Sequence, residues 1–135
     1  MMLDHVSIGV ADLGKARAFY DAVLATLGYA RVFDVDIPGQ GLVAHGYGAS
    51  KDKPEFWIGV PARLDQNSNA QGGAHVSFVA KARKDIDAFH AAALKHGGKD
   101  NGQPGLRPEY HATYYGAFAF DPDGNKIEAC SHHPE

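Results

Sequence analysis

The chain has 135 residues, 44% of them hydrophobic and 21% charged, which predicts a folded protein with one domain or with two very small halves that share a core. The net charge of −3 gives no basic stripe, so we expect neither nucleic-acid nor membrane binding. The single cysteine, Cys130, excludes an intrachain disulfide. Because the N-terminus lacks the basic and apolar regions of a signal peptide, we expect a cytoplasmic protein.

The first half of the chain predicts a strand, a helix and three more strands. Residues 3–10 alternate, with His5 on one face and aliphatic side chains on the other, as in a strand with one buried face. Asp12 is suited to the N-cap of the helix that follows, and Gly28 is suited to its end. The three strands after the helix are expected at residues 30–36, 42–47 and 55–60.

The second half predicts the same order of elements. A strand is expected at residues 74–80, followed by a helix that stops at Gly97-Gly98. The inner face of this helix is expected to carry Ile86, Phe89, Ala93 and Leu94. The later strands are expected near residues 99–101, 113–120 and 125–131, with Asp121-Pro-Asp-Gly124 as the hairpin turn between the last two. The predicted boundaries are a first module at 1–60, a polar linker at 61–73, a second module at 74–131 and a tail at 132–135.

The two halves are copies of one unit, because they match without a gap when one is shifted by seventy residues. The segment HVSIGVADLGKARAFY, which begins at His5, falls on HVSFVAKARKDIDAFH, which begins at His75. Two copies are too few for a solenoid and favour a paired arrangement. We therefore predict an α+β fold of two βαβββ modules related by a pseudo-twofold axis.

The repeat places two histidines at equivalent positions. If the first strands of the modules lie side by side, the rings of His5 and His75 enter one cleft, and Glu128 on the final strand is the third candidate. Two imidazoles and one carboxylate form a facial triad that suits Fe(II), Mn(II), Zn(II), Ni(II) or Co(II) and leaves coordination positions open. Taken singly, each of these residues is more simply explained as an ordinary polar side chain with a hydrogen-bond partner.

These motifs resemble the glyoxalase/bleomycin-resistance/extradiol-dioxygenase superfamily over essentially the whole chain. The resemblance is carried by LDHVSIGVADLGKARAFYDAVLATLGY, GAHVSFVAKARKDIDAFH and AFAFDPDGNKIEA. It implies paired βαβββ modules that curl into incomplete barrels around a metal cleft. It also implies that one divalent metal ion is held by His5, His75 and Glu128.

This chain departs from the family pattern at one position. Glyoxalase I-like members have a fourth metal ligand on the last strand of the first module. Trp57 falls there by spacing to the second histidine, and Ile58 falls there by the seventy-residue shift. Neither side chain binds metal, and Glu55 fits only if the register slips by two residues. Trp57 is more simply a wall of the substrate pocket. The missing carboxylate weakens the case for glyoxalase I activity itself, since a general base must reach the proton that it moves.

The three-ligand set also fits the extradiol ring-cleaving dioxygenases of the superfamily. Those enzymes carry a tyrosine ten residues before the glutamate ligand, where this chain has Phe118. The fosfomycin-modifying thiol transferases are a weaker match, because the basic residue that they carry beyond the glutamate has no counterpart in the tail SHHPE.

We expect a metal-dependent lyase or isomerase that acts on a small substrate with vicinal oxygens, with the Fe(II) dioxygenase as the close alternative. Tyr114, Tyr115 and His111 are the candidates for proton transfer. Phe118 and Arg107 are candidates for the substrate pocket beside Trp57, although Arg107 is more simply explained as a surface residue. His45 is a candidate for the cavity, whereas His90 and His96 are expected at the surface.

The non-catalytic alternative is a ligand-binding protein, because bleomycin-resistance-like members bind ligands without metal in an aromatic groove. Such a groove would use Trp57, Phe56, Phe118 and Tyr115. The retained His5, His75 and Glu128 favour a metal instead. The resemblance further implies a homodimer, in which each site takes His5 from one subunit and the other two ligands from its partner.

Overall fold

The computed structural model describes residues 2–60 and 74–135, and the predicted linker at 61–73 lies outside the described residues. Ten elements follow one another along the chain, and each half has the order βαβββ. They are β1 (Val6–Gly9), α1 (Leu13–Ala25), β2 (Ala30–Ile37), β3 (Gly41–Gly48), β4 (Phe56–Gly59), β5 (Val76–Val79), α2 (Arg83–Lys95), β6 (Lys99–Leu106), β7 (Tyr115–Phe120) and β8 (Lys126–Ser131).

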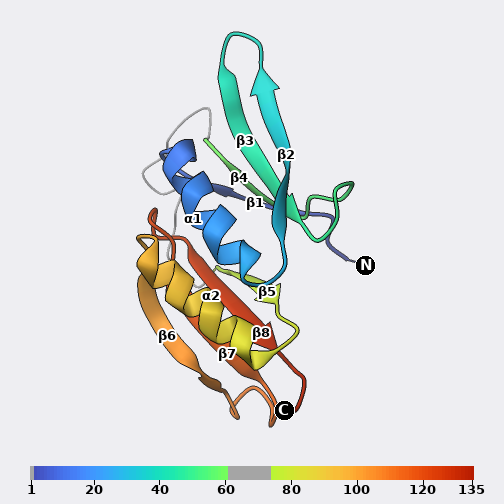
Figure 1. The fold of residues 1–135 in the computed structure, drawn as a ribbon, viewed down its shortest axis with the longest axis vertical. Helices are drawn as coiled ribbons and strands as arrows, with labels where there is room; N and C mark the ends of the chain where they lie inside the picture. The colour runs from blue at the N-terminus through green and yellow to red at the C-terminus, as the bar shows by residue number, and fades with distance from the viewer. Residues whose placement is uncertain (1, 61–73) are drawn as a thin grey trace.

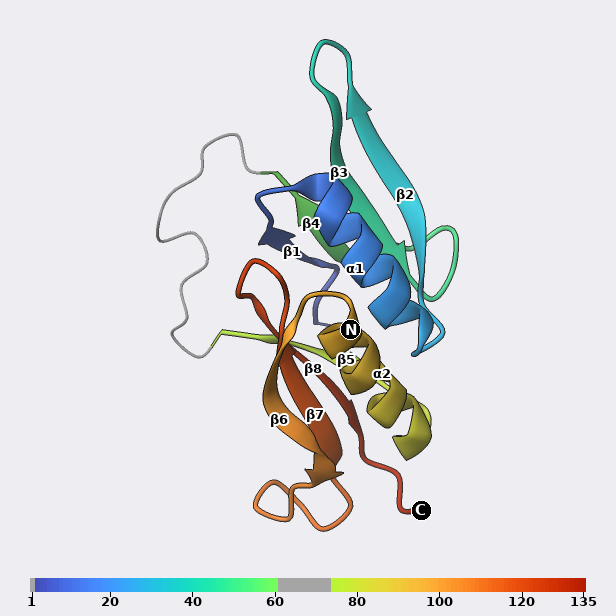
Figure 2. The same cartoon turned by 60° about the vertical axis from the view of Figure 1, so that its left-hand side comes forward.

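The strands form two separate four-stranded sheets, in the orders β1-β4-β3-β2 and β5-β8-β7-β6. In each sheet the first strand of the half pairs in parallel with the last, and the other pairs are antiparallel. Figures 1 and 2 show the sheets one above the other, with α1 and α2 on the same side of the molecule. The predicted α+β fold of two βαβββ modules is confirmed. No helix in the described part of the chain is long and apolar enough to span a bilayer.

Helix α1 forms as its sequence predicts. The carboxylate of Asp12 accepts a hydrogen bond from the backbone N–H of Lys15 at 3.0 Å, which caps the helix. Beyond the last turn the chain reverses at Gly28, whose φ of +86° belongs to the left-handed region that glycine tolerates. The buried face of the helix consists of Ala16, Phe19, Tyr20, Val23 and Leu24.

Helix α2 differs from the prediction at two positions. His90 is buried rather than at the surface, and Leu94, expected on the inner face, is 41% exposed. His90 stands four residues after Ile86, so both side chains lie on the stripe that packs against the second sheet. Its Nε2 atom lies 2.8 Å from the carboxylate of Asp100 on β6, and this hydrogen bond compensates for the burial of the ring.

We predict that Asp100→Asn makes the protein less stable at pH 7 and that the loss disappears in acid. Hydrogen bonds from the Gly102 N–H and from the His90 ring lower the pKa of Asp100. A carboxyl with a lowered folded-state pKa stabilises the fold above its unfolded pKa of about 3.9 and loses that contribution as pH falls through the folded value. Urea unfolding at pH 7 and at acid pH measures the difference. Asp36→Asn, at an exposed site, is the control, and a gap from wild type that stays constant with pH would refute the prediction.

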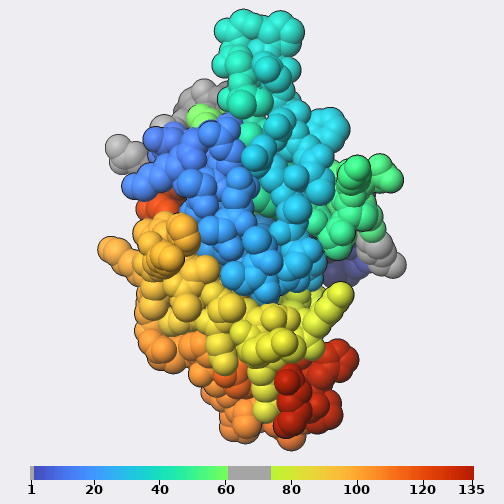
Figure 3. All heavy atoms as spheres, in the orientation of Figure 1, coloured from blue at the N-terminus to red at the C-terminus, as the bar shows by residue number. Residues whose placement is uncertain are grey.

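The two modules share one core and are joined by the turn that follows β7. Phe56 on β4 packs edge-on against Phe78 on β5, with ring centroids 5.0 Å apart. The buried Asp121 accepts a hydrogen bond from the Tyr20 hydroxyl of α1 at 2.7 Å, and burial raises the pKa of this carboxyl. Asn125 donates to the carbonyl of Gly9 at 3.1 Å. The predicted hairpin turn therefore also ties the modules together, and Figure 3 shows their helices forming one continuous surface.

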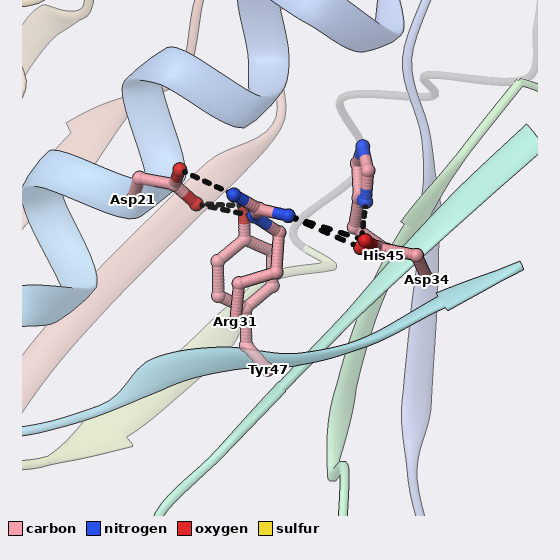
Figure 4. A network of polar contacts seen from close by, with 5 residues as sticks. All are labelled: Asp21, Arg31, Asp34, His45 and Tyr47. Carbon is pink, nitrogen blue, oxygen red and sulfur yellow. Dashed lines mark hydrogen bonds and ion pairs between the residues drawn. The ribbon is translucent and has the colours of Figure 1, made fainter. Parts of the chain in front are cut away.

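A polar network connects the β2–β3 hairpin to α1 (Figure 4). Arg31 bridges Asp21 at 3.1 Å and Asp34 at 3.2 Å, and the Tyr47 hydroxyl donates to Asp21 at 2.9 Å. His45 is fully buried with its Nδ1 2.6 Å from Asp34, and this hydrogen bond is the main cause that lowers the pKa of Asp34. His45 pairs across the sheet with the buried Ile58. It therefore supports the hairpin from the core side and does not line a cavity, contrary to the expectation.

Candidate metal centre

The candidate residues of the second module gather on the face of its sheet that points away from α2. Side chains alternate along β8, so Ile127 and Ala129 enter the core while Glu128 points to the opposite face. His75 directly precedes β5, which is the neighbour of β8 in the sheet. His75 and Glu128 thus lie side by side, because they belong to neighbouring segments of one sheet.

His75 and Glu128 are in direct contact. The Nε2 atom of His75 lies 3.0 Å from Oε1 of Glu128, and the hydroxyl of Tyr114 donates to Oε2 of the same carboxylate. Glu128 is only 2% exposed, so these contacts hold a buried carboxylate in one orientation. Burial and the hydrogen bond to Glu128 raise the pKa of Tyr114, which keeps its phenol protonated as the donor. Two potential metal-ligand atoms are therefore adjacent and oriented.

Gly116 on β7 provides the space that this arrangement needs. A Cβ atom at Gly116 would lie 3.1 Å from Cε1 of Tyr114 and 3.2 Å from Oε2 of Glu128. Both distances are shorter than ordinary contacts, so a side chain at this position would move either Tyr114 or Glu128. A side chain at Gly116 would thus crowd the Tyr114–Glu128 hydrogen bond.

We predict that Gly116→Ala weakens metal binding about tenfold and leaves the fold intact. The expected magnitude is that of losing a group that orients a metal ligand, about 10–100-fold. Titration with Zn(II) or Fe(II) measures the affinity, and circular dichroism checks the fold. Gly14→Ala serves as the control, because a Cβ there meets its nearest atom at an ordinary 3.5 Å. Unchanged affinity in Gly116→Ala would show that the orientation of Glu128 has no influence on binding.

His5 is not brought to His75 and Glu128 within one chain. Its side chain is 50% exposed, and its Nδ1 lies 2.6 Å from the carboxylate of Asp4. With Trp57 it lines a depression of about 370 Å³ on the first sheet. Residues 2–60 and 74–135 contain no group of three His, Cys, Asp or Glu side chains placed to hold a metal ion. The three-ligand site remains a prediction, and a second copy of the chain is one way to complete it.

The pairing of the sheets identifies which residue of the first module corresponds to Glu128. Ser7 and Ser77 are repeat equivalents, and they stand opposite Trp57 and Glu128 in the corresponding parallel strand pairs. Trp57 is therefore the structural counterpart of Glu128, and Ile58 is fully buried in the core. The indole packs over Gly46, where a Cβ would come within 3.0 Å of it.

The three candidates for proton transfer lie in different surroundings. The Tyr114 hydroxyl contacts Glu128, as described above. His111 packs edge-on against Tyr114 with ring centroids 5.5 Å apart, and its Nε2 lies 2.5 Å from Nδ1 of His132. Tyr115 points toward α2, where its hydroxyl donates to Asp87 at 2.6 Å. Only Tyr114 and His111 thus belong to the cluster around Glu128.

Phe118 lies beside the His75–Glu128 pair and is flanked by two cations. Its ring centroid is 6.0 Å from that of His75, 5.8 Å from Cζ of Arg107 and 5.0 Å from Nζ of Lys126. Sequence reasoning missed Lys126. The signal that was available is its position two residues before Glu128, which places both on the same face of β8.

The aromatic groove of the ligand-binding alternative does not form as expected. Phe56 is 4% exposed and packs against Tyr20 and Phe78 in the core, and Tyr115 faces α2. The pattern of alternation on β4 explains this, since Trp57 faces outward and its neighbour must therefore face inward. Trp57 and Phe118 remain on the open faces of the two sheets.

Comparison with known families identifies the superfamily to which the chain belongs. The model of the Glyoxalase/Bleomycin resistance protein/Dioxygenase superfamily matches residues 2–129. The chain belongs to this superfamily. A glyoxalase/bleomycin resistance protein from Albidiferax ferrireducens is 34% identical and aligns over 96% of this chain and 98% of its own, with a TM-score of 0.77. No curated protein sequence matches this superfamily member.

Other solved structures of similar fold include members with named activities. A glyoxalase I mutant from Zea mays is 25% identical with a TM-score of 0.68, and the alignment covers 95% of this chain and 45% of the maize chain. The fosfomycin resistance protein FosX from Listeria monocytogenes is 14% identical with a TM-score of 0.65, over 96% and 92% of the two chains. At this identity, the likeness to FosX concerns the fold alone.

Proposed function

We propose that this superfamily member is a divalent-metal-dependent enzyme of the lyase or isomerase type, acting on a small substrate that chelates the metal through vicinal oxygens. The observation that carries the proposal is the His75–Glu128 pair, whose carboxylate is buried and held by Tyr114. An imidazole nitrogen and a carboxylate oxygen 3.0 Å apart suit a first-row divalent ion as two of its ligands.

The third ligand in this proposal is His5 from a second protomer of a homodimer. His5 is half-exposed on the open face of its own sheet, and its ring contacts the carboxylate of the neighbouring Asp4. No third ligand stands by His75 and Glu128 within the described residues of one chain, and the proposal therefore assigns this place to the second protomer. A twofold dimer would build two identical sites of this kind.

The residues of the chain would divide the chemical work between them. A divalent ion bound by these ligands would supply a Lewis acid, which can stabilise the negative charge that develops on an enolate or alkoxide. Tyr114 would fix the orientation of Glu128 by its hydrogen bond. Together with the adjacent His111, it would also transfer a proton to or from the substrate. Trp57, on the first module, would form one wall of the substrate pocket and exclude water.

The Fe(II) extradiol-type dioxygenase is the second candidate, and one observation favours it. Trp57 occupies the place equivalent to Glu128, so the proposed set has three ligands and no second carboxylate to carry a proton. Retention of Fe(II) would support this candidate, and retention of Zn, Ni or Co would support the lyase or isomerase.

The test is the metal content of untagged protein purified anaerobically without chelators, measured by mass spectrometry. We expect close to one ion per protomer in the wild type, loss of the ion in His75→Ala, and retention in His96→Ala, a control at the exposed residue that follows α2. Absence of metal after reconstitution with each ion would contradict the proposal and leave a ligand-binding protein.

A further inference from the structure

Arg107 and Lys126 are two cationic side chains on the same sheet as His75 and Glu128, and neither forms an ion pair within residues 2–60 and 74–135. Arg107 and Lys126 both stand within 6 Å of the centroid of the Phe118 ring, at 5.8 and 5.0 Å. Two positive charges near one ring, neither of them neutralised by an ion pair, would stabilise an anion bound beside them.

Arg107 is held in place over the sheet rather than extended into solvent. Its Nη2 atom donates to the carbonyl of Gln103 at 2.6 Å. The guanidinium lies over two glycines of β6, where a Cβ at Gly102 would be 3.4 Å from Nη2 and a Cβ at Gly105 would be 3.2 Å from Nη1. The side chain is half-buried. A guanidinium that is already oriented loses little conformational freedom when it binds a planar anion.

Lys126 shares a face of β8 with Glu128. Across the sheet, Lys126 stands opposite Phe120 and Glu128 stands opposite Phe118, so both side chains lie on the open face. The Phe118 ring that contacts both cations also lies 6.0 Å from the His75 ring. The Phe118 ring therefore lies near both cations and near His75, one of the residues proposed to hold the metal.

We infer that Arg107 and Lys126 form an anion-binding pair and that the substrate carries a small oxyanion group, such as a carboxylate, beside the oxygens that chelate the metal. The naming of a substrate class rests on the proposed function, whereas the anion-binding pair does not. The planar fork of Arg107 matches a carboxylate, and Lys126 supplies a second positive charge.

The test uses benzoate as the probe and benzamide as its neutral counterpart, with metal-free protein and isothermal titration calorimetry. We expect benzoate to bind at least about tenfold more tightly than benzamide, because a charge-assisted hydrogen bond is worth a factor of this order. Binding should weaken about tenfold in Arg107→Gln and in Lys126→Gln, and it should be retained in Lys126→Arg. Lys99→Gln, an exposed lysine on β6, is the control.

Two outcomes overturn the inference: equal binding of benzoate and benzamide, or benzoate binding that is unchanged in both glutamine variants. Metal content is measured on the same preparations. Metal binding without benzoate binding would refute the inference and leave the proposed function standing. Benzoate binding by a protein that takes up no metal would leave the anion-binding pair and refute the metal centre.

Discussion

Glu128→Gln is expected to weaken divalent-metal binding more than 100-fold while the protein stays folded. The amide keeps the shape of the side chain and its hydrogen-bond acceptor for Tyr114, but it removes the negative charge that a metal ligand provides. Groups that only orient a metal ligand change affinity about 10–100-fold, so removing a ligand should exceed that range. Competition with a fluorescent chelator measures the affinity for Zn(II) and Co(II).

Glu109→Gln is the matched control, because Glu109 is exposed and lies outside the cluster around Glu128. It should bind metal as the wild type does. If Glu128→Gln kept wild-type affinity, the His75–Glu128 contact would be an ordinary hydrogen bond and the metal centre would lie elsewhere or be absent.

Phe56→Ala is expected to destabilise the protein by about 3–5 kcal/mol, the usual cost of removing a large buried aromatic side chain. Phe56 is 4% exposed and contacts Tyr20 within its own module and Phe78 of the other module. The substitution therefore opens a cavity where the two halves share their core. Chemical unfolding measures the loss of free energy.

Phe33→Ala removes the same side chain from a site that is 53% exposed in the same sheet, and it should cost less than about 1 kcal/mol. Similar losses in the two variants would contradict the shared core. An unfolding transition of Phe56→Ala that splits into two would show instead that the modules unfold separately.

The repeat and the local patterns predicted most of the fold. Alternation in residues 3–10 placed His5 on the open face, and Asp12 and Gly28 mark the region of the first helix as expected. These features depend on neighbours in the sequence, which is why they could be read from it. The burial of His90 could not be read in this way, because it depends on a hydrogen bond between His90 on α2 and Asp100 on β6.

The candidate site was predictable only in part for the same reason. The spacing of the repeat and the resemblance pointed to His75 and Glu128, and the structure places them in contact. The position of His5 relative to them depends on how whole modules pack, within one chain or between two, and no local pattern encodes this. The sequence also could not relate Lys126 to Arg107, because that relation depends on the Arg107 guanidinium folding back over β6.

The most direct test of the shared metal centre combines two variants that each lack one ligand. His5→Ala and His75→Ala are co-expressed with different peptide tags that contain no histidine, and the heterodimer is purified through both tags. We predict that each homodimer binds no metal and that the heterodimer binds one ion, because one of its two sites has His5 from one protomer and His75 and Glu128 from its partner. A heterodimer without metal, formed by protomers whose wild type binds it, would contradict a site shared between protomers.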